Sequence, residues 1–124
     1  MKSADIPVPT SLTLKKRSRQ LAVEFADGIS AALSAELLRV YSPSAEVTGH
    51  SPSEARLVTG KELVGIIRIE PVGRYAVRIV FDDGHDSGLY TWKLLYELST
   101  EHDERWQRYL ERLREAGHER ANLQ

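Results

Sequence analysis

The sequence predicts an α+β domain, in which an antiparallel β-sheet is packed by two or three helices. Apolar residues alternate with others in residues 20–25 and 75–81, as they do in half-buried strands. They recur every three or four residues in residues 33–41 and 101–117, as they do on the buried face of a helix. Of the 124 residues, 41% are hydrophobic and 28% are charged, which is typical of one globular domain.

The first third of the chain predicts an arm, a hairpin and a helix. Two prolines in residues 1–9 favour a flexible arm. Residues 10–26 form two short apolar runs around a polar turn, which indicates a β-hairpin. The Asp27-Gly28 turn ends the second strand. Residues 33–41 follow as a helix, and Ser34 is placed to cap its first turn.

The remaining elements follow a long loop at residues 42–60, which is rich in serine, proline and glycine. The pattern then predicts a second antiparallel region over residues 62–88 and two helices. Its parts are strands at 63–69 and 75–81, a turn at 71–74, an Asp-Asp-Gly turn at 82–84, a brief strand at 86–88, and helices at 89–98 and 101–117. Ser99 or Thr100 is expected to cap the last helix, and residues 118–124 to fray. One domain therefore spans residues 10–117, and we find no internal repeat.

Composition excludes several classes of function. The formal net charge is −1, so no global charge draws the protein to nucleic acid. No apolar run approaches the ~18 residues of a membrane span. There is no cysteine, which excludes thiolate zinc sites, iron–sulfur ligation and a cysteine nucleophile within this chain. Together with the absence of an apolar leader at the N-terminus, this leads us to expect a cytoplasmic protein.

Two sequence features are candidates for binding. The basic run Lys15–Arg19 can contact phosphate, but a solvated hairpin turn explains it better because no aromatic residue is interleaved. His85 directly follows a tight Asp-Gly turn, where a histidine can reach solvent or a metal. Its simpler interpretation is a turn residue that caps nearby backbone.

Around His85 the sequence resembles a known family. Residues 77–92 read VRIVFDDGHDSGLYTW and are similar to the "DGH-x-SG-h-Y-x-W" signature of the gamma-butyrobetaine hydroxylase-like N-terminal domain. Leu38-Arg39 followed by Ser42-Pro43-Ser44 resembles the second block of that family, and the likeness covers about residues 10–115. The resemblance implies a small α+β module, here in the form of a stand-alone bacterial protein, without the iron and 2-oxoglutarate site of the hydroxylases.

The resemblance also implies a metal site that this chain has altered. In the hydroxylases, a Cys-x-Cys-x-x-Cys block and the histidine of the DGH turn hold a structural zinc. The cysteines align with Ser42, Ser44 and Val47, so only His85 of the four ligands remains. Neutral hydroxyls are poor zinc ligands, and we therefore expect no structural zinc.

A different metal set remains open in the same loop. Glu46, His50 and His85 would supply one carboxylate and two imidazoles, a set that suits a divalent metal such as iron. The alternative is a loop that folds by hydrogen bonds without a metal. Because family members bridge the two segments, we expect residues 42–50 to lie against the turn of His85. This hypothesis also assigns Ser42, Ser44 and Arg39 to a binding patch.

The preferred function is therefore a non-catalytic binding or assembly module with a protein partner. One alternative is a metal-binding, iron-linked accessory to iron–sulfur assembly or oxygenase chemistry. The other is a small stand-alone enzyme, for which the sequence offers no cofactor fingerprint or nucleophile–base pair. No cofactor is assigned beyond the divalent metal, and no catalytic residue is named.

Overall fold

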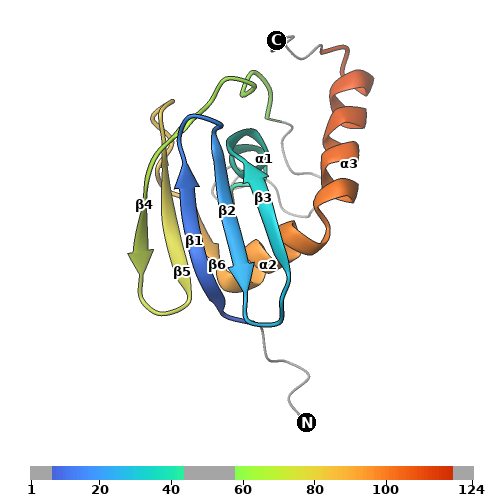
Figure 1. Ribbon diagram of the computed structural model, residues 1–124. Coiled ribbons are helices and arrows are strands. Elements are labelled where there is room, and N and C mark those ends of the chain that lie inside the picture. The colour runs from blue at the N-terminus through green and yellow to red at the C-terminus, as the bar shows by residue number, and fades with distance from the viewer. Residues whose placement is uncertain (1–6, 44–57, 119–124) are drawn as a thin grey trace.

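The computed structural model describes residues 7–43 and 58–118. Six strands and three helices lie in these two ranges (Figure 1). In chain order they are β1 (Pro9–Lys15), β2 (Gln20–Phe25), β3 (Ser30–Ser34), α1 (Ala35–Val40), β4 (Ile66–Val72), β5 (Ala76–Phe81), β6 (Leu89–Thr91), α2 (Trp92–Thr100) and α3 (His102–Glu115). The predicted α+β class is confirmed, with antiparallel sheet and three helices.

The first sheet has the order β1-β2-β3, and both pairings are antiparallel. The predicted hairpin of residues 10–26 is its first two strands. Along β2, Leu21, Val23 and Phe25 are buried, as their alternation predicted. The third strand was not predicted, because Leu33 also fits a helical spacing with later leucines. Its pairing with Leu21 of β2 makes it a strand residue, and the helix begins only after Ser34.

The second sheet has the order β4-β5-β6, so the two β regions form separate sheets rather than one. β4 runs through Val72, and the expected turn at 71–74 therefore shifts toward Gly73, whose φ is +60°. Leu89–Thr91 was predicted as the start of a helix. These residues instead pair with Ala76–Arg78 of β5, and α2 begins at Trp92.

The structure contains an internal repeat that the sequence did not reveal. Three antiparallel strands followed directly by a helix occur twice, as β1-β2-β3-α1 and β4-β5-β6-α2. In each unit the last strand residue caps the helix. The Ser34 hydroxyl accepts the N–H of Leu37 at 3.0 Å, and the Thr91 hydroxyl accepts that of Leu94 at 3.1 Å. Ser34 is the cap that the sequence predicted.

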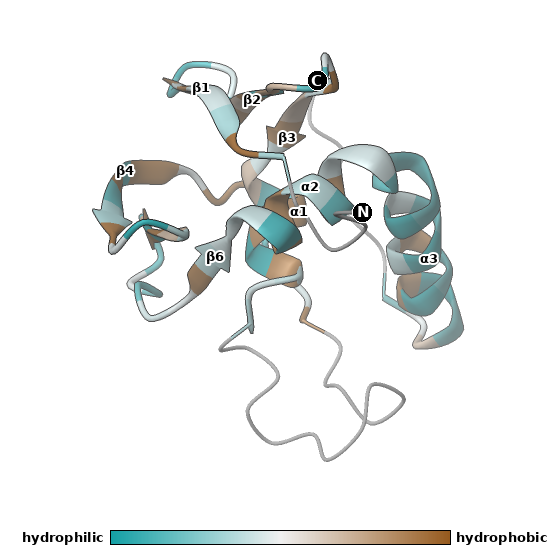
Figure 2. Cartoon of the chain, turned by 90° about the horizontal axis from the view of Figure 1, so that it is seen from below, coloured by the Kyte–Doolittle hydropathy of each residue, from teal (hydrophilic) through white to brown (hydrophobic). Residues whose placement is uncertain are grey.

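The helices α1 and α2 lie at the centre, with the first sheet on one side and the second on another (Figure 2). The main core therefore draws on both sheets and both helices. Its fully buried members include Leu21 and Leu33 of the first unit and Ile79 and Leu95 of the second. One shared core holds the two units together.

Helix α3 lies beyond α1, on the side away from β4 (Figure 2). It packs through Tyr109 and Leu113, which are 1% and 3% exposed, against Val40 of α1. This confirms that its apolar stripe faces the protein. Ser99 and Thr100 do not cap it, because their hydroxyls donate back to carbonyls of α2, which continues through Thr100. Glu101 and Arg105, one helical turn apart, form an ion pair at 3.0 Å.

β4 is an edge strand, because it pairs only with β5 among the strands that the structure describes. Its register shifts between Ile66 and Arg68, and Pro71 lies opposite Val77. Proline lacks an N–H donor and is tolerated where that position faces away from the sheet. Within the described ranges, no helix combines the length and apolarity needed to cross a membrane.

Candidate functional site

His85 closes the turn between β5 and β6. The turn follows the Asp-Gly pattern, with Gly84 at φ +93° and the Asp83 carboxylate accepting the His85 N–H at 3.1 Å. The Phe81 N–H donates to the His85 carbonyl at 2.9 Å. These bonds fix the backbone of His85 and so limit where its ring can lie.

The His85 ring meets Ser42, two residues after the end of α1. Ser42 Oγ and His85 Nε2 are 2.8 Å apart, and Ser42 is fully buried. Gly88 makes this approach possible, because a Cβ at that position would lie 2.4 Å from Ser42 Oγ. Nearby, the Tyr90 hydroxyl donates to the carbonyl of Leu38 in α1. We call this arrangement of Ser42, His85 and Gly88 the Ser42–His85 contact.

Charged side chains surround the turn on its outer side. The Oδ2 atom of Asp83 accepts Arg39 Nε at 2.9 Å and Lys61 Nζ at 2.7 Å. Burial raises the pKa of Asp83, but the hydrogen bonds from Lys61, the His85 N–H and Arg39 outweigh it and lower the pKa to about 2. Asp83 is therefore ionised at neutral pH, and it ties α1 and residue 61 to the turn.

The His85 imidazole favours its neutral form. Burial lowers its pKa below the ordinary value of 6.5, the positive charge of Arg39 lowers it further, and Asp83 opposes both. A neutral imidazole offers one donor and one acceptor, and the serine hydroxyl can complement either. The Ser42–His85 contact thus joins two neutral groups.

Three of the residues predicted for the site come together. Arg39, Ser42 and His85 lie around one turn, although Arg39 reaches it through Asp83 rather than through the imidazole. Ser44, Glu46 and His50 lie outside the described residues, as does Val47. Of the proximity expected between His85 and residues 42–50, the structure shows Ser42 Oγ beside the imidazole, and it does not describe residues 44–50.

The structural zinc that the resemblance to the hydroxylases implies does not fit these residues. A tetrahedral zinc with bonds of about 2.1 Å holds two ligand atoms about 3.4 Å apart. Ser42 Oγ and His85 Nε2 are at hydrogen-bonding distance instead, 2.8 Å. No cysteine is available to supply thiolate charge. Within residues 7–43 and 58–118, no group of three or more His, Asp or Glu side chains is placed to hold a metal ion.

Sequence reasoning missed three contributors to the site. Lys61 lies between the loop expected at residues 42–60 and the β region expected at 62–88, and only its bond to Asp83 reveals its role. Gly88 and Tyr90 were noted only as parts of the family signature. That signature was the one available signal for Gly88 and Tyr90, whereas the Asp-Gly pattern signals only the bond from the His85 N–H to the Asp83 carboxylate.

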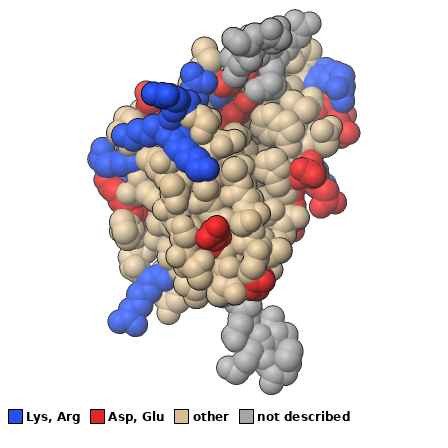
Figure 3. All heavy atoms as spheres, in the orientation of Figure 1, with Lys and Arg blue, Asp and Glu red and all other residues tan. Residues whose placement is uncertain are grey.

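The basic run occupies the β1–β2 turn. Figure 3 shows lysine and arginine side chains gathered over this end of the first sheet, while other residues cover most of the sheet's outer face. Residues 15–19 are exposed. This placement agrees with the hairpin turn expected for the run.

Comparison with known proteins gives one family and several solved structures. The sequence profile of "Gamma-butyrobetaine hydroxylase-like, N-terminal" matches residues 12–96. Two proteins with NMR solution structures are similar over most of both chains. The first is 52% identical with a TM-score of 0.82, covering 100% of this chain and 92% of the other. The second is 45% identical with a TM-score of 0.82, covering 97% and 94%.

A crystal structure of a protein of unknown function from Acidithiobacillus ferrooxidans, assigned to the DUF971 family, is 38% identical. Its TM-score is 0.63, and the match covers 73% of this chain and 91% of that chain. The search of curated proteins found no match. The family profile includes β2, both Asp-Gly turns and the Ser42–His85 contact. The chain therefore belongs to the gamma-butyrobetaine hydroxylase-like N-terminal domain family.

Proposed function

We propose that this domain is a non-catalytic binding module that works in a protein assembly. The observation that carries the proposal is the complete burial of Ser42 in its hydrogen bond to His85. The residues that mark the family are used here to join α1 to the β5–β6 turn. They support a surface, and they do not face a substrate.

The same geometry argues against hydrolysis by a serine–histidine pair. A nucleophilic serine must present its oxygen to a carbonyl carbon at ~3–3.5 Å. Ser42 is 0% exposed, and Gly88 lies over its oxygen. The carboxylate of Asp83 accepts the backbone N–H of His85, where it does not orient the ring.

The surface that this contact supports has the composition of a protein-binding face. Residues 61–65 are held against the turn by paired bonds between Gly65 and Asp82. Leu63, 59% exposed, and Ile67, 43% exposed, lie beside this attachment. Apolar side chains bordered by the Lys61–Asp83 ion pair resemble the core and rim of a protein interface.

The experiment compares two apolar-to-acidic substitutions in the same hairpin region. Leu63→Asp alters the proposed surface, whereas Tyr75→Asp alters a side chain that is 73% exposed at the other end of the β4–β5 hairpin. Tagged proteins are expressed in the native cell and their size is measured by gel filtration of the extract. We expect the wild type and Tyr75→Asp to elute well above 14.0 kDa, and Leu63→Asp to elute as the free chain.

Three results would count against the proposal. Wild-type protein that elutes at its own size in the extract has no stable assembly. Iron that co-purifies in stoichiometric amount, and is lost in a Glu46→Gln/His50→Gln variant, would favour the iron-linked accessory instead. Labelling of Ser42 by a serine-reactive fluorophosphonate would show that the serine is accessible and would favour an enzyme.

A further inference from the structure

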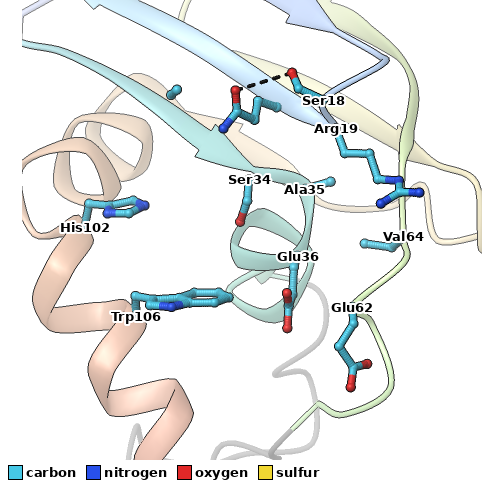
Figure 4. A pocket seen from close by; sticks show the side chains of 11 residues that line it. Ser18, Arg19, Ser34, Ala35, Glu36, Glu62, Val64, His102 and Trp106 are labelled. Atoms are coloured by element: carbon cyan, nitrogen blue, oxygen red, sulfur yellow. Dashed lines mark hydrogen bonds between the residues drawn. The ribbon is translucent and has the colours of Figure 1, made fainter. Parts of the chain in front are cut away.

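An open cavity of about 340 Å³ lies apart from the Ser42–His85 contact and shares no residue with it. Four segments line it: the β1–β2 turn, the strand-to-helix junction at Ser34, the residues before β4, and the first turns of α3 (Figure 4). Its size is at the lower end of the ~300–1,000 Å³ range of small-molecule sites. A metabolite-sized ligand therefore fits it better than a polymer does.

Arg19 brings a guanidinium to this cavity from an unusual backbone position. Its φ is +57°, and it is the only non-glycine residue with positive φ in the described ranges. Two hydrogen bonds hold it there: its N–H donates to Lys16 at 3.2 Å, and its carbonyl accepts the N–H of Ala35 at 2.8 Å. Left-handed backbone at a residue other than glycine is strained, and such strain concentrates at functional positions.

Two carboxylates, an indole ring and the His102 imidazole are among the other groups of the cavity wall. Glu36 is only 5% exposed, and the Tyr109 hydroxyl donates to its Oε2 at 2.7 Å, which fixes the carboxylate. Glu62 lines the cavity from the segment before β4. Figure 4 shows Trp106 and Arg19 on opposite sides, with Glu36 between them. A carboxylate beside an indole ring is the environment that an organic cation prefers.

The charges of the lining define the ligand further. Glu36 and Glu62 supply two carboxylates to the lining, Arg19 supplies one guanidinium, and His102 adds an imidazole. A ligand that complements the carboxylates and the guanidinium carries one anionic group for Arg19 and two cationic groups for the carboxylates and the indole. Bidentate pairing makes a carboxylate a good partner of arginine.

We propose that this cavity binds a free basic amino acid. The α-carboxylate pairs with Arg19, while the cationic side chain lies between the carboxylates and Trp106. This ligand is additional to the protein partner proposed above, and it does not depend on the Ser42–His85 contact.

Isothermal titration of the full chain with L-arginine tests the proposal, with two analogues that each lack one charge. Agmatine lacks the carboxylate and citrulline lacks the side-chain charge. We expect saturable binding of one L-arginine per chain, and roughly tenfold or weaker affinity for each analogue, since each loses a charge-assisted contact. Absence of saturable heat at millimolar arginine would overturn the proposal.

The Arg19→Gly variant tests the assigned contact. Glycine adopts the same φ without strain, so the turn should persist while the guanidinium is removed. We expect it to weaken arginine binding roughly tenfold and to leave agmatine binding unchanged. Glu62→Gln should weaken both ligands. Arg17→Gly is the matched control, because Arg17 lies in the same turn but does not line the cavity.

Two results would contradict the assignment of Arg19 as the partner of the ligand carboxylate. Equal loss in Arg17→Gly and Arg19→Gly would mean that the basic turn attracts the carboxylate without a defined site. Loss of agmatine binding in Arg19→Gly would mean that Arg19 supports the fold and does not contact the ligand. Gel filtration of the same variants in extract reports the protein assembly separately, so the two proposals can fail independently.

Discussion

Two turns of this molecule have the same backbone and different uses. In the first unit, the Ile29 N–H donates to Asp27 at 3.0 Å and Gly28 has φ +94°. In the second, the His85 N–H donates to Asp83 at 3.1 Å and Gly84 has φ +93°. A phenylalanine two residues before the aspartate closes each turn with its N–H, at 2.8 Å and 2.9 Å.

The side chain that follows the glycine accounts for the difference. Ile29 packs against the main core, whereas His85 contacts the hydroxyl of Ser42. The partners of the second carboxylate oxygen also differ. Asp27 Oδ2 accepts a hydrogen bond from the Tyr96 hydroxyl, whereas Asp83 Oδ2 accepts hydrogen bonds from Arg39 and Lys61. The first turn thus contributes to packing, and the second organises polar groups. The repeated backbone therefore constrains where the site lies and does not specify its chemistry.

Alanine substitutions of the two turn phenylalanines test whether the two units depend equally on one core. Phe25 and Phe81 are 3% and 1% exposed in the same cluster. We expect Phe25→Ala and Phe81→Ala each to lower the free energy of unfolding by about 3–5 kcal/mol. Urea denaturation measures both. Two separate transitions, or a cost in only one variant, would show that the units fold independently.

The Ser42–His85 contact tests what the second turn adds. Ser42→Ala removes the hydroxyl from a buried imidazole nitrogen and should cost about 1–3 kcal/mol of unfolding free energy. In a His85→Ala background the same change should cost clearly less, because the partner is already gone. A double-mutant cycle in urea measures this coupling. Additive costs would mean that the two side chains do not stabilise each other.

The glycines test whether the two turns are equivalent in backbone energy. At Gly28 and Gly84 an added Cβ would meet nothing within 4 Å, so only the positive φ resists substitution. Alanine at either position should cost about 1–2 kcal/mol, equally in both turns. Gly88→Ala is the contrasting variant, since its Cβ would collide with Ser42 Oγ. Thermal unfolding of the three proteins compares them, and unequal costs at 28 and 84 would refute the equivalence.

The smallest expected difference is the pH dependence that His85 gives the second turn between about pH 5 and pH 8, where the first turn has Ile29. Burial and the charge of Arg39 lower the pKa of His85 in the folded protein below its ordinary value of 6.5. Below pH 6.5, His85 therefore takes up a proton more readily in the unfolded chain than in the folded one. Stability should therefore fall as pH falls below 6.5. The variant His85→Ile copies Ile29 of the first turn and should remove this part of the dependence. Unfolding free energies from pH 5 to pH 8 measure it, roughly the range over which a histidine titrates, and an unchanged profile in His85→Ile would contradict the assignment.

Local patterns predicted most of the fold. The alternation of Leu21, Val23 and Phe25 gave β2, and Ser34 marked the start of α1, because each depends on neighbours in sequence. β3 and β6 were missed or taken as helix, since their strand character comes from pairing with β2 and β5. The repeat could not be found from the sequence, because the two units share few residues beyond the Asp-Gly turns and the capping hydroxyls.

The candidate site was predictable in part. The family signature pointed to His85 and Ser42, and the structure brings these two residues together. Lys61 could not be predicted as a partner of Asp83, because 22 residues separate them and the ion pair depends on how residues 61–65 lie against the turn. The cavity at Arg19 was equally hidden, since it collects side chains from four distant segments.

The edge of β4 that no other described strand pairs with bears on how copies of this chain meet at high concentration. An unpaired edge strand offers its backbone to a second molecule, which is a common start of ordered aggregation. Here the irregular register between Ile66 and Arg68 bends that edge, and Pro71 removes one donor that an incoming strand would need. Apolar side chains can therefore remain exposed along β4, open to a partner's side chains, while the backbone beneath them resists adding a strand.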